Sequence, residues 1–136
     1  MLTCNKGRVQ NKIETFSTFG DAGDAGHGGI TRFSLSEEAL QARAEFVKRM
    51  RAVGVKTVTD DMANMYATIP GTEANLPGIV MASHCDSVRN GGNYDGILGV
   101  IAAMEVVETI VIEKIPHKHP ITAMIWTNEE GSLYPP

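Results

Sequence analysis

The sequence has 136 residues, of which 43% are hydrophobic and 21% charged, and its formal net charge at pH 7 is −4. This length and composition predict one folded domain with a single hydrophobic core and exclude a disordered chain. The protein is mildly acidic and its lysines and arginines are scattered along the sequence, so we expect neither nucleic acid nor an anionic membrane as a partner.

The first half of the chain predicts two helices and two strands. Apolar residues spaced three or four apart favour a helix over residues 7–19, followed by a glycine-rich loop over residues 21–29. A second helix is expected from a capping box at Ser34 and Glu37 to about residue 53, where Gly54 ends it in a left-handed conformation. Residues 55–59 and 65–69 are predicted strands that can pair as an antiparallel hairpin.

The second half predicts a strand, a helix and a strand. Residues 79–83 and 121–127 are short apolar runs, typical of strands buried on both faces. Between them a helix is expected from about residue 97 to 113, and because it is apolar nearly all round it should be well covered. This spacing is that of a parallel crossover unit. We therefore expect the α/β fold class, with helices covering a partly parallel mixed sheet.

The cysteine content and the apolar runs indicate a cytoplasmic protein. Only Cys4 and Cys85 are present, too few for a disulfide framework. A single bridge between them is an open alternative, but reduced thiols are the simpler interpretation. The first ten residues lack the apolar core of a signal peptide, and the longest apolar run is too short to cross a bilayer.

Ionisable residues follow both of the predicted buried strands. The first strand leads into His84, Cys85 and Asp86, and the second leads into Glu129 and Glu130 after one asparagine. If the two strands are parallel, these groups emerge at the same edge of the sheet, where ligands bind in open α/β folds. Asp95 precedes the intervening helix, which begins at that edge too. The topology alone therefore predicts that these side chains converge.

A histidine among several carboxylates favours a metal site. Imidazole and carboxylate together suit zinc, manganese, cobalt or nickel, and a carboxylate can bridge two ions. Adjacent Glu129 and Glu130 point in different directions, so one can bind metal while the other acts as a general base. Taken singly, His84 is more often a packed residue, Asp95 a helix cap, and the glutamates a solvated pair. Because all of them are expected in one place, a metal site is favoured over these separate structural roles.

Three motifs at residues 83–88 (SHCDSV), 90–96 (NGGNYDG) and 126–132 (WTNEEGS) resemble those of the M20 metallopeptidase superfamily. Within it they are most similar to the branch of N-carbamoyl-L-amino acid hydrolases and allantoate amidohydrolases, and residues 28–32 resemble its N-terminal segment. The resemblance implies a zinc-exopeptidase-like catalytic domain. It implies two divalent ions, Zn or else Mn, Co or Ni, as cofactors.

The resemblance also implies a role for each residue of the cluster. His84 would bind one metal, Asp95 would bridge both, and Glu130 would bind the other. Glu129 would be the general base, and Asp86 would orient and polarise His84 from behind. The Asp95–Gly96 peptide bond would be cis, as is typical of the family.

Substrates and partners follow from the same resemblance. The expected reaction is hydrolysis of linear amide bonds in N-carbamoyl amino acids, allantoate or related ureido acids, with His27 a weak candidate for substrate contact. An M20 aminoacylase or peptidase is the alternative enzyme. Cys85 stands where the family more often has an apolar residue, and we expect a buried structural thiol there rather than a nucleophile paired with His84.

Members of this family are longer chains that form homodimers, with two further histidine ligands and a lid and dimerisation domain downstream. The resemblance therefore predicts that residues 1–136 are the N-terminal portion of a catalytic domain, without that lid domain and inactive or nearly so alone. A non-catalytic truncated product is the alternative outside the enzyme class.

Overall fold

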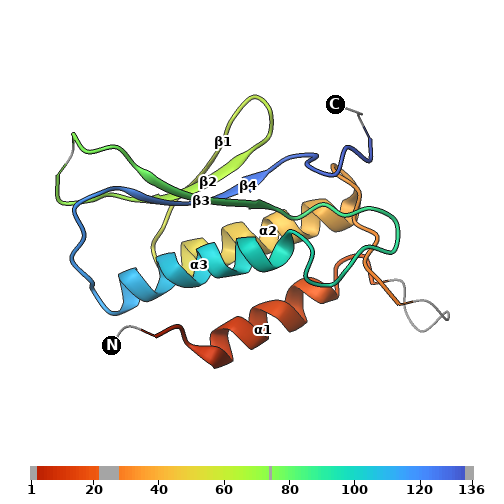
Figure 1. Cartoon of the computed structure of the whole chain (residues 1–136), viewed down its shortest axis with the longest axis horizontal. Coiled ribbons are helices and arrows are strands. Elements are labelled where there is room, and N and C mark those ends of the chain that lie inside the picture. The colour runs from red at the N-terminus through yellow and green to blue at the C-terminus, as the bar shows by residue number, and fades with distance from the viewer. Residues whose placement is uncertain (1–2, 22–27, 74, 134–136) are drawn as a thin grey trace.

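The protein is one mixed sheet with its helices on one side (Figure 1). The computed structural model describes residues 3–21, 28–73 and 75–133. In chain order the elements are α1 (Lys6–Ser17), α2 (Glu37–Ala52), β1 (Thr57–Thr59), β2 (Met65–Ile69), β3 (Ile79–His84), α3 (Ile97–Ile112) and β4 (Ile121–Trp126). The helices α2 and α3 lie under the sheet, and α1 packs beneath α3 (Figure 1). The α/β class is confirmed.

Side-chain caps explain where α1 and α2 begin. The Asn5 side chain accepts a hydrogen bond from the backbone N–H of Arg8 at 2.9 Å. At α2 the cap is Ser36, whose Oγ accepts from the backbone N–H of Ala39 at 3.3 Å. The expected cap at Ser34 is therefore wrong, because Leu35 has a φ of 63° and redirects the chain before the helix begins. Gly54 has a φ of 79° after α2, as expected.

The sheet has the strand order β1-β2-β4-β3. The predicted hairpin of β1 and β2 is antiparallel, and β2 pairs with β4 antiparallel as well. The strands β3 and β4 are parallel and are joined through α3, which confirms the predicted crossover unit. Parallel pairing brings the carboxyl ends of β3 and β4 to the same edge of the sheet.

The two crossover strands differ in burial. Residues 121–125 of β4 are all buried, as predicted. In β3, however, Ile79 is 51% and Val80 55% exposed, so its expected burial on both faces is wrong. The reason is position: among the described residues β3 is the outer strand next to β4, and no helix lies on the upper face of the sheet (Figure 1). The helix α3 is likewise uncovered on one side, where Leu98 is 44% exposed.

A group of paired charges lies between α1 and α3, and we call it the buried ion cluster. It consists of Arg8, Lys12, Glu105 and Glu108. The Lys12 side chain is fully buried, with Nζ 3.0 Å from Glu105 Oε2 and 2.6 Å from Glu108 Oε2. Arg8 Nη2 lies 2.7 Å from Glu105 Oε1. These ion pairs hold α1 against α3, because the cations of α1 compensate the carboxylates of α3.

Both cysteines are free thiols, Cys4 exposed and Cys85 buried. No helix among the described residues is long and apolar enough to span a bilayer.

Candidate metal centre

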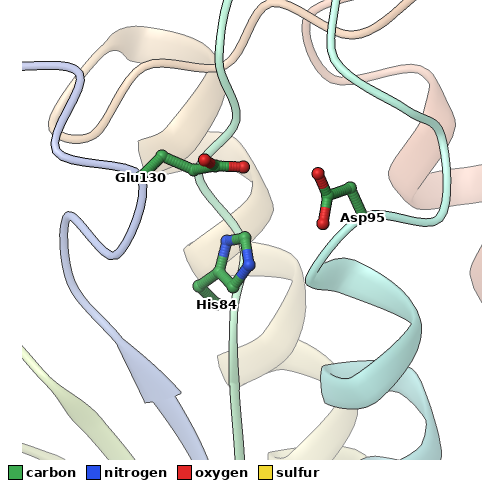
Figure 2. Close-up of side chains that lie close together, drawn as sticks. All are labelled: His84, Asp95 and Glu130. Atoms are coloured by element: carbon green, nitrogen blue, oxygen red, sulfur yellow. The ribbon is translucent and has the colours of Figure 1, made fainter.

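Three side chains from different elements converge at the carboxyl edge of the sheet. His84 is the last residue of β3, Asp95 precedes α3, and Glu130 follows β4. One ligand atom from each lies within 4.8 Å of the other two, and no other such group of histidine, cysteine or carboxylate residues occurs in the described part of the chain. Figure 2 shows the three side chains directed toward one another. The structure thus brings together the residues that the topology predicted would meet.

The His84 ring is held in one orientation by its own strand end. Its Nδ1 lies 3.1 Å from the backbone carbonyl oxygen of Asp86. A carbonyl oxygen only accepts, so this contact assigns the proton to Nδ1 and leaves the Nε2 lone pair available to a ligand. Nε2 is 3.4 Å from Oε2 of Glu129, whose side chain is 53% exposed. The general-base candidate therefore lies beside the candidate ligand nitrogen, at the open side of the site.

The segment around Gly96 places Asp95 against the ring. The structure has no cis peptide bond among the residues it describes, so the expected cis bond between Asp95 and Gly96 is wrong. Gly96 instead reverses the chain with a φ of 62°, and a Cβ at this position would overlap the His84 imidazole. Ser83 Oγ donates a hydrogen bond of 2.7 Å to the Gly96 carbonyl oxygen, which ties the start of α3 to β3.

Asp86 is 2% exposed, and its side chain contacts the site in a different way from the one that the resemblance implied. Its Oδ2 accepts a hydrogen bond from the backbone N–H of Glu130 at 3.2 Å. Its Oδ1 is 3.7 Å from His84 Nδ1, beyond hydrogen-bond distance, and has no hydrogen-bond partner among the described residues. The carboxylate of Asp86 thus holds the Glu130 backbone, while its carbonyl orients His84.

Negative charge is in excess at this edge. The pKa of Glu130 is raised, first by burial and then by the charge of Asp95; His84 opposes this shift, and Glu129 and Asp86 add smaller increases. A carboxylate crowded by other carboxylates gains from a cation among them. Imidazole nitrogen with carboxylate oxygen is a donor set for zinc, manganese, cobalt or nickel.

Cys85 takes no part in this chemistry. It is 3% exposed, and burial raises the pKa of its thiol to about 11, so the thiolate that a nucleophile needs is not formed near neutral pH. The expected buried structural thiol is confirmed.

Arg32 supports the site, and the sequence reasoning missed it. Its guanidinium, 2% exposed, donates to the carbonyl oxygens of Cys85, Phe16 and Phe19. It thereby ties the end of α1 to the segment directly after His84. Burial lowers the pKa of Arg32. Spacing carried no signal for this role, because the carbonyl groups come from distant parts of the chain.

A polar cleft of about 540 Å³ is lined in part by residues 90–93, which lie just before Asp95 in the chain. His27, the weak candidate for substrate contact, lies outside the described residues. The cleft is lined by Asp21, Gly28, Gly29, Asn90, Gly91, Gly92 and Asn93.

The comparisons with known proteins agree with this geometry. The model of peptidase family M28 matches residues 64–135, which include all three converging side chains. A putative amidohydrolase/peptidase from Burkholderia cenocepacia superposes with a TM-score of 0.92 at 32% identity, over 100% of this chain and 32% of its own.

Curated relatives are similar over nearly the whole of this chain. An N-carbamoyl-L-amino-acid amidohydrolase from Pseudomonas sp. (strain NS671) is 34% identical over 98% of this chain and 31% of its own length. An allantoate amidohydrolase from Escherichia coli (strain K12) is 33% identical over 99% of this chain and 32% of its own. The chain thus spans about a third of the length of these relatives.

Proposed function

Because this chain belongs to peptidase family M28 and is related to N-carbamoyl-L-amino-acid and allantoate amidohydrolases, we propose that it forms part of a hydrolase of linear amides that uses two metal ions. The proposed substrates are N-carbamoyl amino acids, allantoate and related ureido acids, the compounds for which these relatives are named. The observation that carries the proposal is the convergence of His84, Asp95 and Glu130 within 4.8 Å.

The residues present fit divalent ions. His84 offers Nε2, and Asp95 and Glu130 offer carboxylate oxygens, of which those of the exposed Asp95 are the candidates to bridge. Divalent ions bound here would lower the pKa of a water and polarise the carbonyl of the amide that is cleaved. The raised pKa of Glu130 supports this assignment, because its charge is uncompensated without a cation.

Glu129 is the proposed general base. Its exposed carboxylate next to His84 Nε2 is in position to take a proton from the attacking water and return it to the leaving nitrogen. Asp86 holds the backbone of Glu130 and, through its carbonyl, the tautomer of His84. In this proposal each of the five residues at the candidate metal centre binds an ion, orients a neighbour or moves a proton.

The relatives that carry the proposed activity are about three times as long as this chain. We therefore make separate proposals for metal binding and for substrate turnover. The 136 residues are proposed to supply three ligands for divalent ions and to turn over little substrate alone. Homodimer formation and the remaining substrate contacts are proposed for a protein of the relatives' length.

A metal titration with a substrate assay tests the proposal. Zn²⁺, Mn²⁺, Co²⁺ and Ni²⁺ are titrated into the chain and into Glu130→Gln, and ammonia release from N-carbamoyl amino acids and allantoate is measured. We expect binding in the wild type, at least tenfold weaker binding in Glu130→Gln, and little turnover. Equal binding by both proteins, or by neither, would overturn the assignment of the site.

A further inference from the structure

The loop that carries Glu129 and Glu130 is held at its start by a turn from another part of the sheet. Thr127, the first residue after β4, donates from Oγ1 to the Ala63 carbonyl oxygen at 2.7 Å. The backbone N–H of Thr127 donates to Asn64 Oδ1 at 3.0 Å. Ala63 and Asn64 lie in the turn between β1 and β2, residues 60–64, which we call the hairpin turn.

The hairpin turn is itself held rigid by Asp60. Asp60 Oδ1 accepts from the backbone N–H groups of Met62 and Asn64 at 3.0 and 2.8 Å. Its Oδ2 accepts from Asn64 Nδ2 at 3.0 Å and from the Tyr66 hydroxyl at 2.7 Å. Because Asn64 Nδ2 is committed to Asp60, its Oδ1 is fixed toward the Thr127 amide. The turn thus presents two preset acceptors to the end of β4.

An arginine from the helical layer strengthens the same junction. Arg43, from α2, donates from Nη1 to Thr127 Oγ1 at 3.3 Å and from Nη2 to the Ala63 carbonyl oxygen. Asn128, with a φ of 58°, then begins the turn that leads to Glu129 and Glu130. The far side of this turn is held by the bond from the Glu130 amide to Asp86. The loop is therefore fixed at both of its ends.

We propose that Thr127 and Asn64 are positioning residues for the metal centre: by anchoring the start of the loop to the hairpin turn, they set where the Glu130 carboxylate meets His84 and Asp95. This proposal rests on the proposed function. Loss of the Thr127 hydroxyl removes its bonds to Ala63 and Arg43 and leaves only the bond from the Thr127 amide to Asn64 at the start of the loop, so the carboxylate samples a wider range of positions. Ligand-orienting partners of this kind change metal affinity by about 10–100-fold.

A pair of substitutions with a matched control tests the proposal in the full chain. Thr127→Val removes the hydroxyl, and Thr127→Ser keeps it. Thr122→Val makes the same change within β4, near the end of the strand that is farther from the loop, where Thr122 Oγ1 and Thr68 Oγ1 are 2.8 Å apart. Co²⁺ affinity, the visible absorption of bound Co²⁺ and the urea unfolding midpoint are measured for all three and the wild type.

We expect about tenfold weaker Co²⁺ binding and an altered absorption band in Thr127→Val. Thr127→Ser should bind Co²⁺ within about twofold of the wild type. Thr122→Val should bind Co²⁺ as tightly as the wild type does, even if its unfolding midpoint falls as far as that of Thr127→Val. Asn64→Ala should weaken binding in the same direction as Thr127→Val, and the double variant by less than the product of the two, because both act through one anchor. Wild-type affinity in Thr127→Val overturns the proposal, and equal losses in Thr127→Val and Thr122→Val do so as well.

Amide hydrogen exchange of residues 128–131 in the metal-free proteins separates this proposal from the metal assignment. Faster exchange at Glu130 in Thr127→Val, but not in Thr122→Val, is expected whether or not Co²⁺ binds. If the wild type binds no Co²⁺ but the exchange differs in this way, the metal site fails and the anchor stands. Unchanged exchange in Thr127→Val overturns the anchor.

Discussion

The buried ion cluster and the candidate metal centre both gather several carboxylates, but the charges of those carboxylates are compensated differently. In the buried ion cluster, Glu105 and Glu108 form ion pairs with Lys12 and Arg8, with nitrogen-to-oxygen distances of 2.6–3.6 Å. At the candidate metal centre, the carboxylates of Asp95, Glu129 and Glu130 lie near one imidazole, that of His84, and Asp86 lies behind them. The cluster's charges are satisfied by the protein itself, whereas those of the metal centre are not.

The pKa values of the two regions show this difference. Burial by itself raises the pKa of Glu105, but hydrogen bonds from Arg8, from the Asn5 amide and from Lys12, together with the charge of Lys12, lower it to about 2. At the metal centre the pKa of Glu130 is raised. Ionised Glu105 therefore stabilises the fold, while ionised Glu130 costs stability that a bound cation recovers.

Breaking the cluster should give the largest effect. Lys12→Met leaves two carboxylates buried without their shared cation, and we expect it to destabilise the protein by about 3–5 kcal/mol, measured by urea unfolding. The matched control is Lys48→Met, because the Lys48 side chain is 76% exposed and its partner Glu45 keeps a second cation, Arg49. That control should cost no more than about 1 kcal/mol. Similar losses in both variants would show that the buried pairs contribute no more than surface ones.

The pH dependence of the cluster comes next in size. Because the pKa of Glu105 is about 2 in the folded protein and lowered from an ordinary value of 4.5, its contribution is complete above pH 4.5 and is lost as the pH falls from 4.5 to 2. The loss should be on the order of 3 kcal/mol. Unfolding free energies across this range are compared with those of Glu105→Gln, whose curve should be flatter. Parallel curves for the two proteins would contradict the assignment to Glu105.

At the metal centre, a divalent ion should stabilise the fold. With free Co²⁺ at about one hundred times its dissociation constant, we expect about 2.7 kcal/mol of added stability, measured as a rise in the thermal midpoint. His84→Ala should abolish the rise. His119→Ala is the control, because His119 Nδ1 lies 2.8 Å from the Pro77 carbonyl oxygen in a different loop. A rise that survives in His84→Ala would place the ion elsewhere.

The smallest effect should come from removing one charge at the metal centre. Glu130→Gln removes a charge that is disfavoured by burial and by Asp95, so we expect the metal-free protein to gain about 0.5 kcal/mol in urea unfolding at pH 7. In saturating Co²⁺ the order should reverse, and the wild type should be the more stable. Asp61→Asn, an exposed carboxylate of the hairpin turn, should change neither value. A loss of stability in metal-free Glu130→Gln would mean that the centre is not in negative excess.

Much of the fold followed from local patterns. The spacing of apolar residues predicted α1, α2 and α3, and the short apolar runs predicted β3 and β4 with their parallel crossover. The burial of β3 was mispredicted, because an apolar strand has the same pattern at the edge of a sheet as in its middle. The cap at Ser36 was missed because Ser34 offered an equally good pattern and only the conformation of Leu35 selects between them.

For the candidate site, the sequence by itself determined which residues meet: parallel strands that end at His84 and lead to Glu130 must present them at one edge, whatever packs beneath. Only the tertiary structure decided how they are held. The contacts of Arg32, Asp86 and Thr127 join segments tens of residues apart, and no local spacing records them. Backbone conformation at Gly96 was likewise decided by the fold, because the ring of His84 fills the space that any larger residue would need.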